Sequence, residues 1–273
     1  MSTPRIGITC RFQPAGDERP ASGGELPRPH RDQLTLAAAY YDVFWELGGV
    51  PVPLALPPRV DRRWLQALLD SIDALVLTGG RDLPPQLYGQ SPHARTKVMH
   101  DRRAAFEPVL FGLADERRMP VLAICLGHQV VHVARGGRLI QHIPDQHREA
   151  PIEHSVEPAE PRGRVCHRVR IEPDSQLARI VGATALDVNS RHHQAVDPQH
   201  PGRGLRPVAW SDDGILEASE DFSDGRFLLT VQWHPEDLTG IPSQRALFEA
   251  LTDAARQSSR RRGSAGSATP PGT

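Results

Sequence analysis

Short apolar runs alternate with amphipathic stretches along the first 140 residues of the chain. The apolar runs that predict β-strands lie near 5–9, 50–55, 73–78 and 120–125. The helical patterns lie near 32–48, 61–70, 100–117 and 127–135. This alternation predicts an α/β fold, with a central, mostly parallel sheet and helices on both of its faces.

The later part of the chain has a different pattern, with shorter strands and one closing helix. The strands are expected near 167–171, 185–188, 206–210, 215–219 and 226–233. The helix is expected over residues 242–256. Residues 13–29 are rich in Pro and Gly and predict a mobile loop at the edge of a cleft. Residues 141–166 are rich in Pro, His, Glu and Arg and predict an irregular loop over the same cleft.

The length of 273 residues allows one full hydrophobic core, at the upper end of the usual range for a single domain. We expect this domain to span residues 1–256. Residues 257–273 are low in apolar side chains and rich in Ser, Gly and Arg, which predicts a disordered C-terminal tail.

Charge and lysine content narrow the classes of partner. The formal net charge of −1 offers no electrostatic footprint for nucleic acid or for a membrane surface, so we expect neither. Lys97 is the only lysine, and the chain therefore has no Gly-Lys-Ser/Thr phosphate-binding loop. We expect no cofactor, and any ATP-driven step would belong to another protein.

The three cysteines, Cys10, Cys125 and Cys166, are too few and too scattered for a disulfide framework or a Cys-x-x-Cys metal site. The N-terminus has no basic–apolar signal pattern, and no run of about 18 apolar residues would cross a membrane. We therefore expect a reduced, cytoplasmic protein, which is the environment that a thiol nucleophile needs.

One of these cysteines lies where an apolar run meets a helical pattern. Residues 120–124 predict a strand, Cys125 follows, and the helical pattern after it ends at Gly136-Gly137. A strand–tight turn–helix unit of this kind presents a nucleophile at the carboxyl edge of the sheet. It also places the thiol at a helix N-terminus, which favours the thiolate. A buried structural cysteine at a strand end is the alternative interpretation.

His234 and Glu236 form a second candidate pair. They follow a predicted strand, and Pro235 disfavours the helical conformation for His234. Side chains at positions i and i+2 of an extended segment project to the same side, so the imidazole and the carboxylate can lie together. Such a carboxylate orients a histidine base and stabilises its imidazolium. Taken alone, the pair also fits a surface His and Glu at a strand end.

Two glycines follow the predicted strand over 73–78. Gly79 and Gly80 allow the backbone to approach a ligand and to present N–H groups in unusual conformations. Together with the N–H of Leu126, one of them can form an oxyanion hole, in which each donor is worth roughly 3–4 kcal/mol. An ordinary strand-to-loop turn is the alternative interpretation.

In their joint order and spacing these segments resemble a class I, triad-type glutamine amidotransferase domain. The resemblance is strongest to the γ-glutamyl-γ-aminobutyrate hydrolase branch, the peptidase C26 group, and it extends over nearly all of residues 5–250. It implies a flavodoxin-like α/β fold. The motifs that carry it are Leu-Thr-Gly-Gly-Arg-Asp at 77–82, Cys-Leu-Gly-His-Gln at 125–129, Asn-Ser-Arg-His-His-Gln at 189–194 and Gln-Trp-His-Pro-Glu at 232–236, with further matches at 5–9, 48–54, 136–141 and 213–218.

The resemblance implies a role for each candidate residue. Cys125 would be the nucleophile, His234 the general base and then acid, and Glu236 the carboxylate that orients it. The backbone N–H groups of Gly80 and Leu126 would form the oxyanion hole.

The resemblance also implies a set of substrate-binding residues. Gln129 would face the α-amino-acid head of a glutamyl group, next to Gly79. Ser190, His192 and His193 would hold its carboxylate and amine. A polar loop around a hydrogen-bonded histidine is the alternative interpretation of residues 189–194.

The implied reaction is the hydrolysis of a small-molecule γ-glutamyl amide through a thioester, as in polyamine catabolism. One departure is that relatives in the hydrolase branch often have Arg directly after the cysteine, whereas this chain has Leu126 followed by Gly127 and His128. Glutaminase subunits that supply ammonia to a partner synthase have the latter pattern, so such a protein is one alternative. A non-catalytic ligand-binding or assembly module is another. The leaving amine and the oligomeric state, homo-oligomer included, stay open.

Thirteen histidines raise the question of a metal site. His192 and His193 are adjacent and would point apart in a strand, while His142, His147 and His154 lie in one loop-like stretch. No His-Glu-x-x-His pattern occurs. We therefore expect no bound metal.

Overall fold

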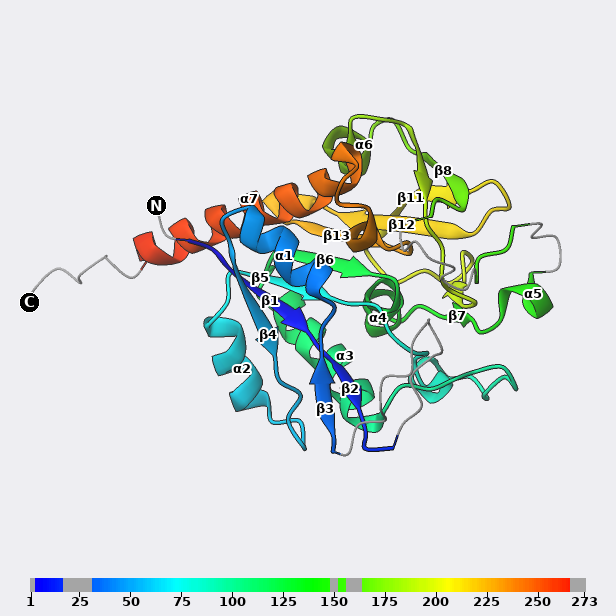
Figure 1. Ribbon diagram of the computed structural model, residues 1–273, viewed down its shortest axis with the longest axis horizontal. Helices are drawn as coiled ribbons and strands as arrows, with labels where there is room; N and C mark the ends of the chain where they lie inside the picture. Colours follow the sequence, from blue (N-terminus) through cyan, green and yellow to red (C-terminus); the bar gives the residue numbers. More distant parts are fainter. Residues whose placement is uncertain (1–2, 17–30, 148–151, 156–163, 266–273) are drawn as a thin grey trace, which may run out of the picture.

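Five parallel strands form the half of the main sheet that carries the candidate site (Figure 1). The computed structural model describes residues 3–16, 31–147, 152–155 and 164–265. In spatial order, the parallel strands are β4 (Val50–Leu54), β1 (Arg5–Thr9), β5 (Ala74–Leu77), β6 (Val121–Ile124) and β13 (Leu228–Val231). Because they run in one direction, their carboxyl ends meet at one edge of the sheet.

Strand β13 joins this half of the sheet to an antiparallel half. Beyond it lie β12 (Leu216–Asp221), β11 (Arg206–Ser211), β8 (His167–Ile171) and β9 (Ala185–Val188). Two short strands complete the sheet, which has eleven strands among the described residues: β10 (Ala195–Val196) pairs with β12 and with β7 (Leu139–Ile140). The predicted α/β class with a mostly parallel central sheet is confirmed, and the structure adds that the sheet is mixed.

Helices cover both faces of the sheet (Figure 1). One face is covered by α2 (Arg62–Asp70), α3 (Asp101–Glu116) and α4 (Leu126–Ala134), and the other by α1 (Ala38–Glu46), α6 (Gln176–Val181) and α7 (Pro242–Ala265). In β5, Leu75 and Leu77 pack in the first layer, whereas Ala74 and Val76 pack in the second, because successive side chains of a strand point to opposite faces. All four are buried, as is typical of a parallel strand between two helical layers.

The helix expected over 32–48 was wrong in its first part. Residues Gln33–Thr35 form strand β3, which pairs antiparallel with β2 (Arg11–Gln13), and α1 begins only at Ala38. Leu34 lies opposite Phe12 in this pairing. Strand pairing across the tertiary structure therefore outweighs the local preference for helix, and local periodicity does not report it.

The closing helix is longer than expected. Helix α7 continues through Ala265, past the expected end at residue 256. Extending an existing helix costs far less than starting one, and Gln and Arg are good helix formers, so the chain continues the helix after residue 257. No described helix, α7 included, combines the length and the apolar character needed to cross a membrane. The domain boundary at 256 stays a prediction.

Three expectations fall partly outside the described residues. They are the mobility of residues 17–29, the irregular loop at 148–151 and 156–163, and the tail at 266–273. The described part of the loop expected at 141–166 includes a short helix, α5 (Ile143–Gln146). The remaining short elements are the 3-10 helices η1 (Pro85–Tyr88), η2 (Ser223–Gly225) and η3 (Pro235–Leu238).

Candidate active site

Cys125 lies at the turn between β6 and α4, and its backbone is strained. Its φ of 53° and ψ of −104° are rare for a residue with a side chain, at a cost of about 1–3 kcal/mol. The turn is held from both neighbouring strands. The N–H of Cys125 donates to the carbonyl oxygen of Val231 at 2.8 Å, and Gly127 packs so tightly that a Cβ there would lie 2.7 Å from the Cβ of Leu77.

His234 follows the adjacent strand β13 and lies between Glu236 and Cys125. Its Nδ1 is 2.6 Å from Oε1 of Glu236, and its ring also interacts with the sulfur of Cys125. Gly79 packs against both groups, since a Cβ built on it would lie 2.8 Å from Cε1 of His234 and 3.6 Å from the Cβ of Cys125. The structure thus brings together four of the predicted residues at the ends of β5, β6 and β13.

The charges around His234 favour its protonated form. Burial opposes that charge, but the Glu236 carboxylate and the Cys125 sulfur outweigh it and raise the pKa of His234 to about 10. Burial also opposes the charge of Glu236, but His234 and the hydroxyl of Tyr40 outweigh it, and the pKa of Glu236 is lowered from its ordinary value of 4.5. An imidazolium in this position can give its proton to a leaving group.

Two residues to which the sequence assigned no role support the His–Glu pair. The hydroxyl of Tyr40 donates to Oε1 of Glu236 at 2.7 Å and accepts the N–H of Gly79 at 3.4 Å. The side chain of Asn189 bonds twice to the backbone of His234: it donates to the carbonyl oxygen and accepts from the N–H, both at 2.9 Å. The bond from Tyr40 fixes the orientation of the Glu236 carboxylate. The two bonds from Asn189 fix the backbone of His234, and with it the position of the imidazole.

The loop after β5 is anchored by a buried arginine, which sequence reasoning also missed. Arg103 on α3 donates to the carbonyl oxygens of Thr78 at 2.9 Å and Gly79 at 3.0 Å. The C=O and N–H of a trans peptide unit point in opposite directions, so the N–H of Gly80 points away from Arg103. A Cβ at Gly80 would collide with the guanidinium of Arg103. The oxyanion role of Gly80 and Leu126 stays a prediction.

Two of the predicted substrate-binding residues have polar groups bonded inside the protein. The amide nitrogen of Gln129 donates to the carbonyl oxygen of Gln194 at 3.3 Å and to Oε1 of Gln232 at 3.1 Å. The hydroxyl of Ser190 donates to the carbonyl oxygen of His154 at 2.8 Å. Both side chains are buried. Their contacts with a substrate remain predictions, and these bonds indicate that their first role is to hold the loops around the site.

The adjacent histidines face different surroundings. His192 is buried, and its Nδ1 bonds to the carbonyl oxygen of Gln194 at 2.9 Å. His193 is only half-buried: its Nε2 lies 3.0 Å from Oδ2 of Asp82, and its Nδ1 lies 3.1 Å from Nδ1 of His142. Of the two, only His193 presents a substantial exposed surface to a ligand.

A cavity of about 520 Å³ lies beside this loop. His192 and His193 line one part of it, and three charged side chains, Arg95, Lys97 and Glu153, line others. The cavity is large enough for a small molecule, and among the described residues of its lining Arg and Lys outnumber Asp and Glu.

This fold, with a cysteine on a strand–helix turn beside a buried His–Glu pair, defines a protein of the class I glutamine amidotransferase type. Within that class the chain belongs to the peptidase C26 family, whose model matches residues 15–236.

Curated relatives cover most of the chain. The protein Rv2859c of Mycobacterium tuberculosis, whose name gives glutamine amidotransferase as an unproven activity, is 42% identical over 93% of this chain and 75% of its own length. The γ-glutamyl-γ-aminobutyrate hydrolase PuuD of Escherichia coli K12 is 32% identical over 93% of this chain and 94% of its own length.

Solved structures share the fold at low sequence identity. A Thermoplasma acidophilum protein, provisionally described as part of a GMP synthase, superposes with a TM-score of 0.61 at 14% identity, over 96% of this chain and 99% of its own. The glutaminase domain of Trypanosoma brucei CTPS, with bound acivicin, gives a TM-score of 0.56 at 18% identity, over 93% and 94%. At these identities the likeness concerns the fold alone.

Proposed function

We propose that this protein hydrolyses a γ-glutamyl amide to glutamate and an amine, with Cys125 as the nucleophile. The observation that carries the proposal is the buried His234–Glu236 pair, with its 2.6 Å contact, next to the strained turn that bears the thiol. Membership of the peptidase C26 family and the 32% identity to a γ-glutamyl-γ-aminobutyrate hydrolase support the same reaction class.

The first half of the reaction forms a thioester. The thiolate of Cys125 attacks the γ-carbonyl carbon, and the carbonyl oxygen takes the negative charge, which the N–H groups of Gly80 and Leu126 stabilise. His234 then gives its proton to the nitrogen of the departing amine as the C–N bond breaks. Glu236 stays ionised throughout and holds the ring in the required orientation.

The second half hydrolyses the thioester. His234, now neutral, takes a proton from a water molecule, whose oxygen attacks the thioester carbon. The C–S bond breaks, glutamate leaves, and the thiolate faces an imidazolium again. The raised pKa of His234 fits this cycle, because the resting enzyme must hold that proton for the leaving amine.

The cavity beside the loop that bears His192 and His193 supports a leaving amine that carries a carboxylate, such as γ-aminobutyrate. Among the described residues of its lining, Arg95 and Lys97 offer two positive charges, against one negative charge from Glu153. Ammonia released from glutamine would make no use of them. The chemistry of the cavity therefore favours a γ-glutamyl conjugate of an amino acid over glutamine.

The alternative of a glutaminase subunit rests on the motif Cys-Leu-Gly-His-Gln. In the structure, Leu126 and His128 are both buried, and Nδ1 of His128 lies 2.8 Å from the hydroxyl oxygen of Thr230. These two residues thus pack the helix against the sheet, which weakens the motif as an argument for ammonia delivery to a synthase.

The test is the release of glutamate by the purified protein from γ-glutamyl-γ-aminobutyrate and from glutamine, with Cys125→Ala as the blank. We expect Cys125-dependent hydrolysis that prefers the conjugate. Arg95→Glu should raise KM for the conjugate roughly 5- to 30-fold, as expected for the reversal of one partly solvated charge, and leave KM for glutamine nearly unchanged.

A matched control is Arg63→Glu, the same change on the exposed surface of α2. It should change neither KM. Glutamate release that persists in Cys125→Ala would refute the thioester route. A preference for glutamine, with no effect of Arg95→Glu, would favour the glutaminase alternative and lead to a search for a synthase.

A further inference from the structure

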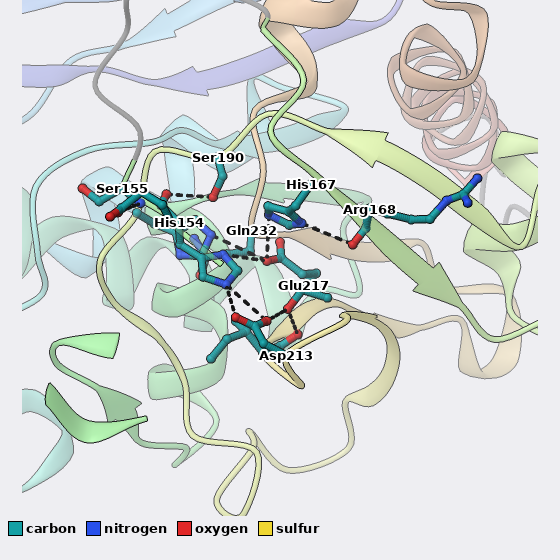
Figure 2. A network of polar contacts seen from close by, with 12 residues as sticks. His154, Ser155, His167, Arg168, Ser190, Asp213, Glu217 and Gln232 are labelled. Atoms are coloured by element: carbon teal, nitrogen blue, oxygen red, sulfur yellow. Dashed lines mark hydrogen bonds and ion pairs between the residues drawn. The ribbon is translucent and has the colours of Figure 1, made fainter. Parts of the chain in front are cut away.

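Four side chains from four separate segments converge on one buried point outside the Cys–His–Glu site (Figure 2). His154 comes from the segment 152–155, His167 begins β8, His192 lies in the loop after β9, and Glu217 lies on β12. One ring nitrogen of each histidine points at Oε1 of Glu217, at 3.5, 3.5 and 3.7 Å in that order. One ligand atom from each of the four side chains lies within 4.8 Å of all the others.

Hydrogen bonds on the outer side of two rings assign their tautomers. Nδ1 of His192 lies 2.9 Å from the carbonyl oxygen of Gln194, and Nδ1 of His167 lies 3.3 Å from the carbonyl oxygen of Arg168. A carbonyl oxygen only accepts, so in a neutral ring the proton is on Nδ1. The Nε2 atoms that face Glu217 therefore carry lone pairs.

The third ring is oriented by a carboxylate. Nε2 of His154 lies 3.1 and 3.3 Å from the two oxygens of Asp213 (Figure 2). Asp213 also accepts a bond from the hydroxyl of Ser211. The proton of a neutral His154 is therefore on Nε2, and its Nδ1 presents a lone pair to Glu217. All three imidazoles thus direct an acceptor at a carboxylate, which is also an acceptor.

This arrangement leaves five buried polar atoms without a hydrogen bond among the described residues. They are Nδ1 of His154, Nε2 of His167, Nε2 of His192 and both carboxylate oxygens of Glu217. A proton on Glu217 would serve one of the three lone pairs and leave the other two facing no donor. A cation in the centre would satisfy all four side chains at once.

The geometry points to a bound divalent transition metal ion: we propose that His154, His167, His192 and Glu217 hold one Zn²⁺. Bonds of about 2.0–2.1 Å in a tetrahedron put neighbouring ligand atoms ~3.3 Å apart, and the three observed nitrogen–oxygen distances exceed this only slightly. Three imidazoles and a carboxylate suit Zn²⁺ better than Ca²⁺ or Mg²⁺, which take oxygen ligands.

The surroundings match a structural metal site. Each imidazole gives its other N–H to a carboxylate or a carbonyl oxygen, which is the usual support for a metal-bound histidine. Four protein ligands fill a tetrahedral shell, and all four side chains are buried, so no position remains for a reacting water. The proposed role is therefore to hold segments together and is distinct from the chemistry at Cys125.

The metal would fix the loop that positions the catalytic histidine. His192 lies three residues after Asn189, whose side chain bonds twice to the backbone of His234. Glu217 lies on β12, which pairs with β13, the strand that leads to His234. This proposal replaces the sequence-based expectation that the protein binds no metal.

The experiment uses full-length protein purified without a histidine tag. Metal is removed with a chelator, Zn²⁺ is titrated back in a metal buffer, and bound metal is counted by mass spectrometry of the elements. We expect one Zn²⁺ per chain, and binding more than 100-fold weaker in His167→Gln and in Glu217→Gln. His128→Gln, at a buried histidine outside the cluster, and Cys125→Ala should bind as the original protein does.

A second measurement does not depend on whether the variants fold. Zn²⁺ at 100 times its Kd should raise the Tm of the original protein by about 5–10 °C. X-ray absorption at the zinc edge should show a first shell of nitrogen and oxygen without sulfur. Neither readout uses turnover, so they are independent of the proposed hydrolase activity.

Three results would overturn the proposal. One is the absence of stoichiometric Zn²⁺ together with an unchanged Tm. Another is undiminished binding by folded Glu217→Gln and His167→Gln. The third is a sulfur ligand with loss of the metal in Cys125→Ala, which would place the ion between Cys125 and His234.

Discussion

Gly79→Ala tests the site geometry with a single methyl group. Gly79 does not have a left-handed φ, so alanine costs little in backbone conformation, and the effect is steric. The new Cβ would lie 2.8 Å from Cε1 of His234, whereas two carbons in contact need about 3.5–4.0 Å. The imidazole or the loop must therefore move by about 0.7 Å or more. Because a misplacement of about 1 Å can cost a hundredfold in rate, we expect kcat/KM to fall roughly 10- to 100-fold.

The assay is steady-state glutamate release, with the Tm of each variant measured in parallel. Gly112→Ala is the matched control, because Gly112 lies within α3 and a Cβ there would have no neighbouring atom within 4 Å. It should leave kcat/KM unchanged and raise stability by about 0.5–1 kcal/mol. A folded Gly79→Ala protein with kcat/KM within twofold of the original would refute the placement of His234 against this loop.

Three further substitutions test the groups around the imidazole. Glu236→Gln removes the main charge that raises the pKa of His234 to about 10, so the alkaline limb of the pH profile of kcat/KM should move to lower pH; an unmoved limb would contradict this cause. A histidine whose pKa is raised on folding stabilises the folded state fully below pH 6.5, and progressively less as the pH rises through about 10. The Tm advantage of the original protein over Glu236→Gln should therefore shrink across that pH range. Tyr40→Phe removes a charge-assisted hydrogen bond to Glu236 and should lower the free energy of unfolding in urea by about 1.5–3 kcal/mol; a change below about 0.5 kcal/mol would show that the bond is unimportant. Asn189→Ala should lower kcat at least tenfold with little change in KM, measured by glutamate release, because it positions His234 without touching substrate; a change in KM alone would assign Asn189 to binding.

The features predictable from the sequence are those encoded over a few neighbouring residues. An apolar run that ends on Cys125 and leads into a helix specifies the strained turn. The spacing of His234 and Glu236 around Pro235 places their side chains together. Two adjacent glycines mark the close approach at Gly79. Each signal is local. The resemblance to a known family is what joined these signals into one candidate site.

The features missed depend on contacts between distant segments. Tyr40 reaches Glu236 only because α1 packs over the ends of the strands, and Arg103 reaches Gly79 from α3. The proposed metal ligands come from four segments, and of the adjacent pair His192-His193 only His192 belongs to this cluster. Strand β3 is missed for the same reason, since its pairing partner, β2, is a separate segment earlier in the chain.

The most direct test of the central claim is covalent labelling with a diazoketone analogue of glutamine, followed by intact-mass and peptide analysis. We expect one adduct per chain, on Cys125, formed in step with the loss of activity and slowed by γ-glutamyl-γ-aminobutyrate. Cys10 and Cys166 should remain unmodified. Equal, slow labelling of all three cysteines, or full activity after Cys125 is modified, would contradict the account.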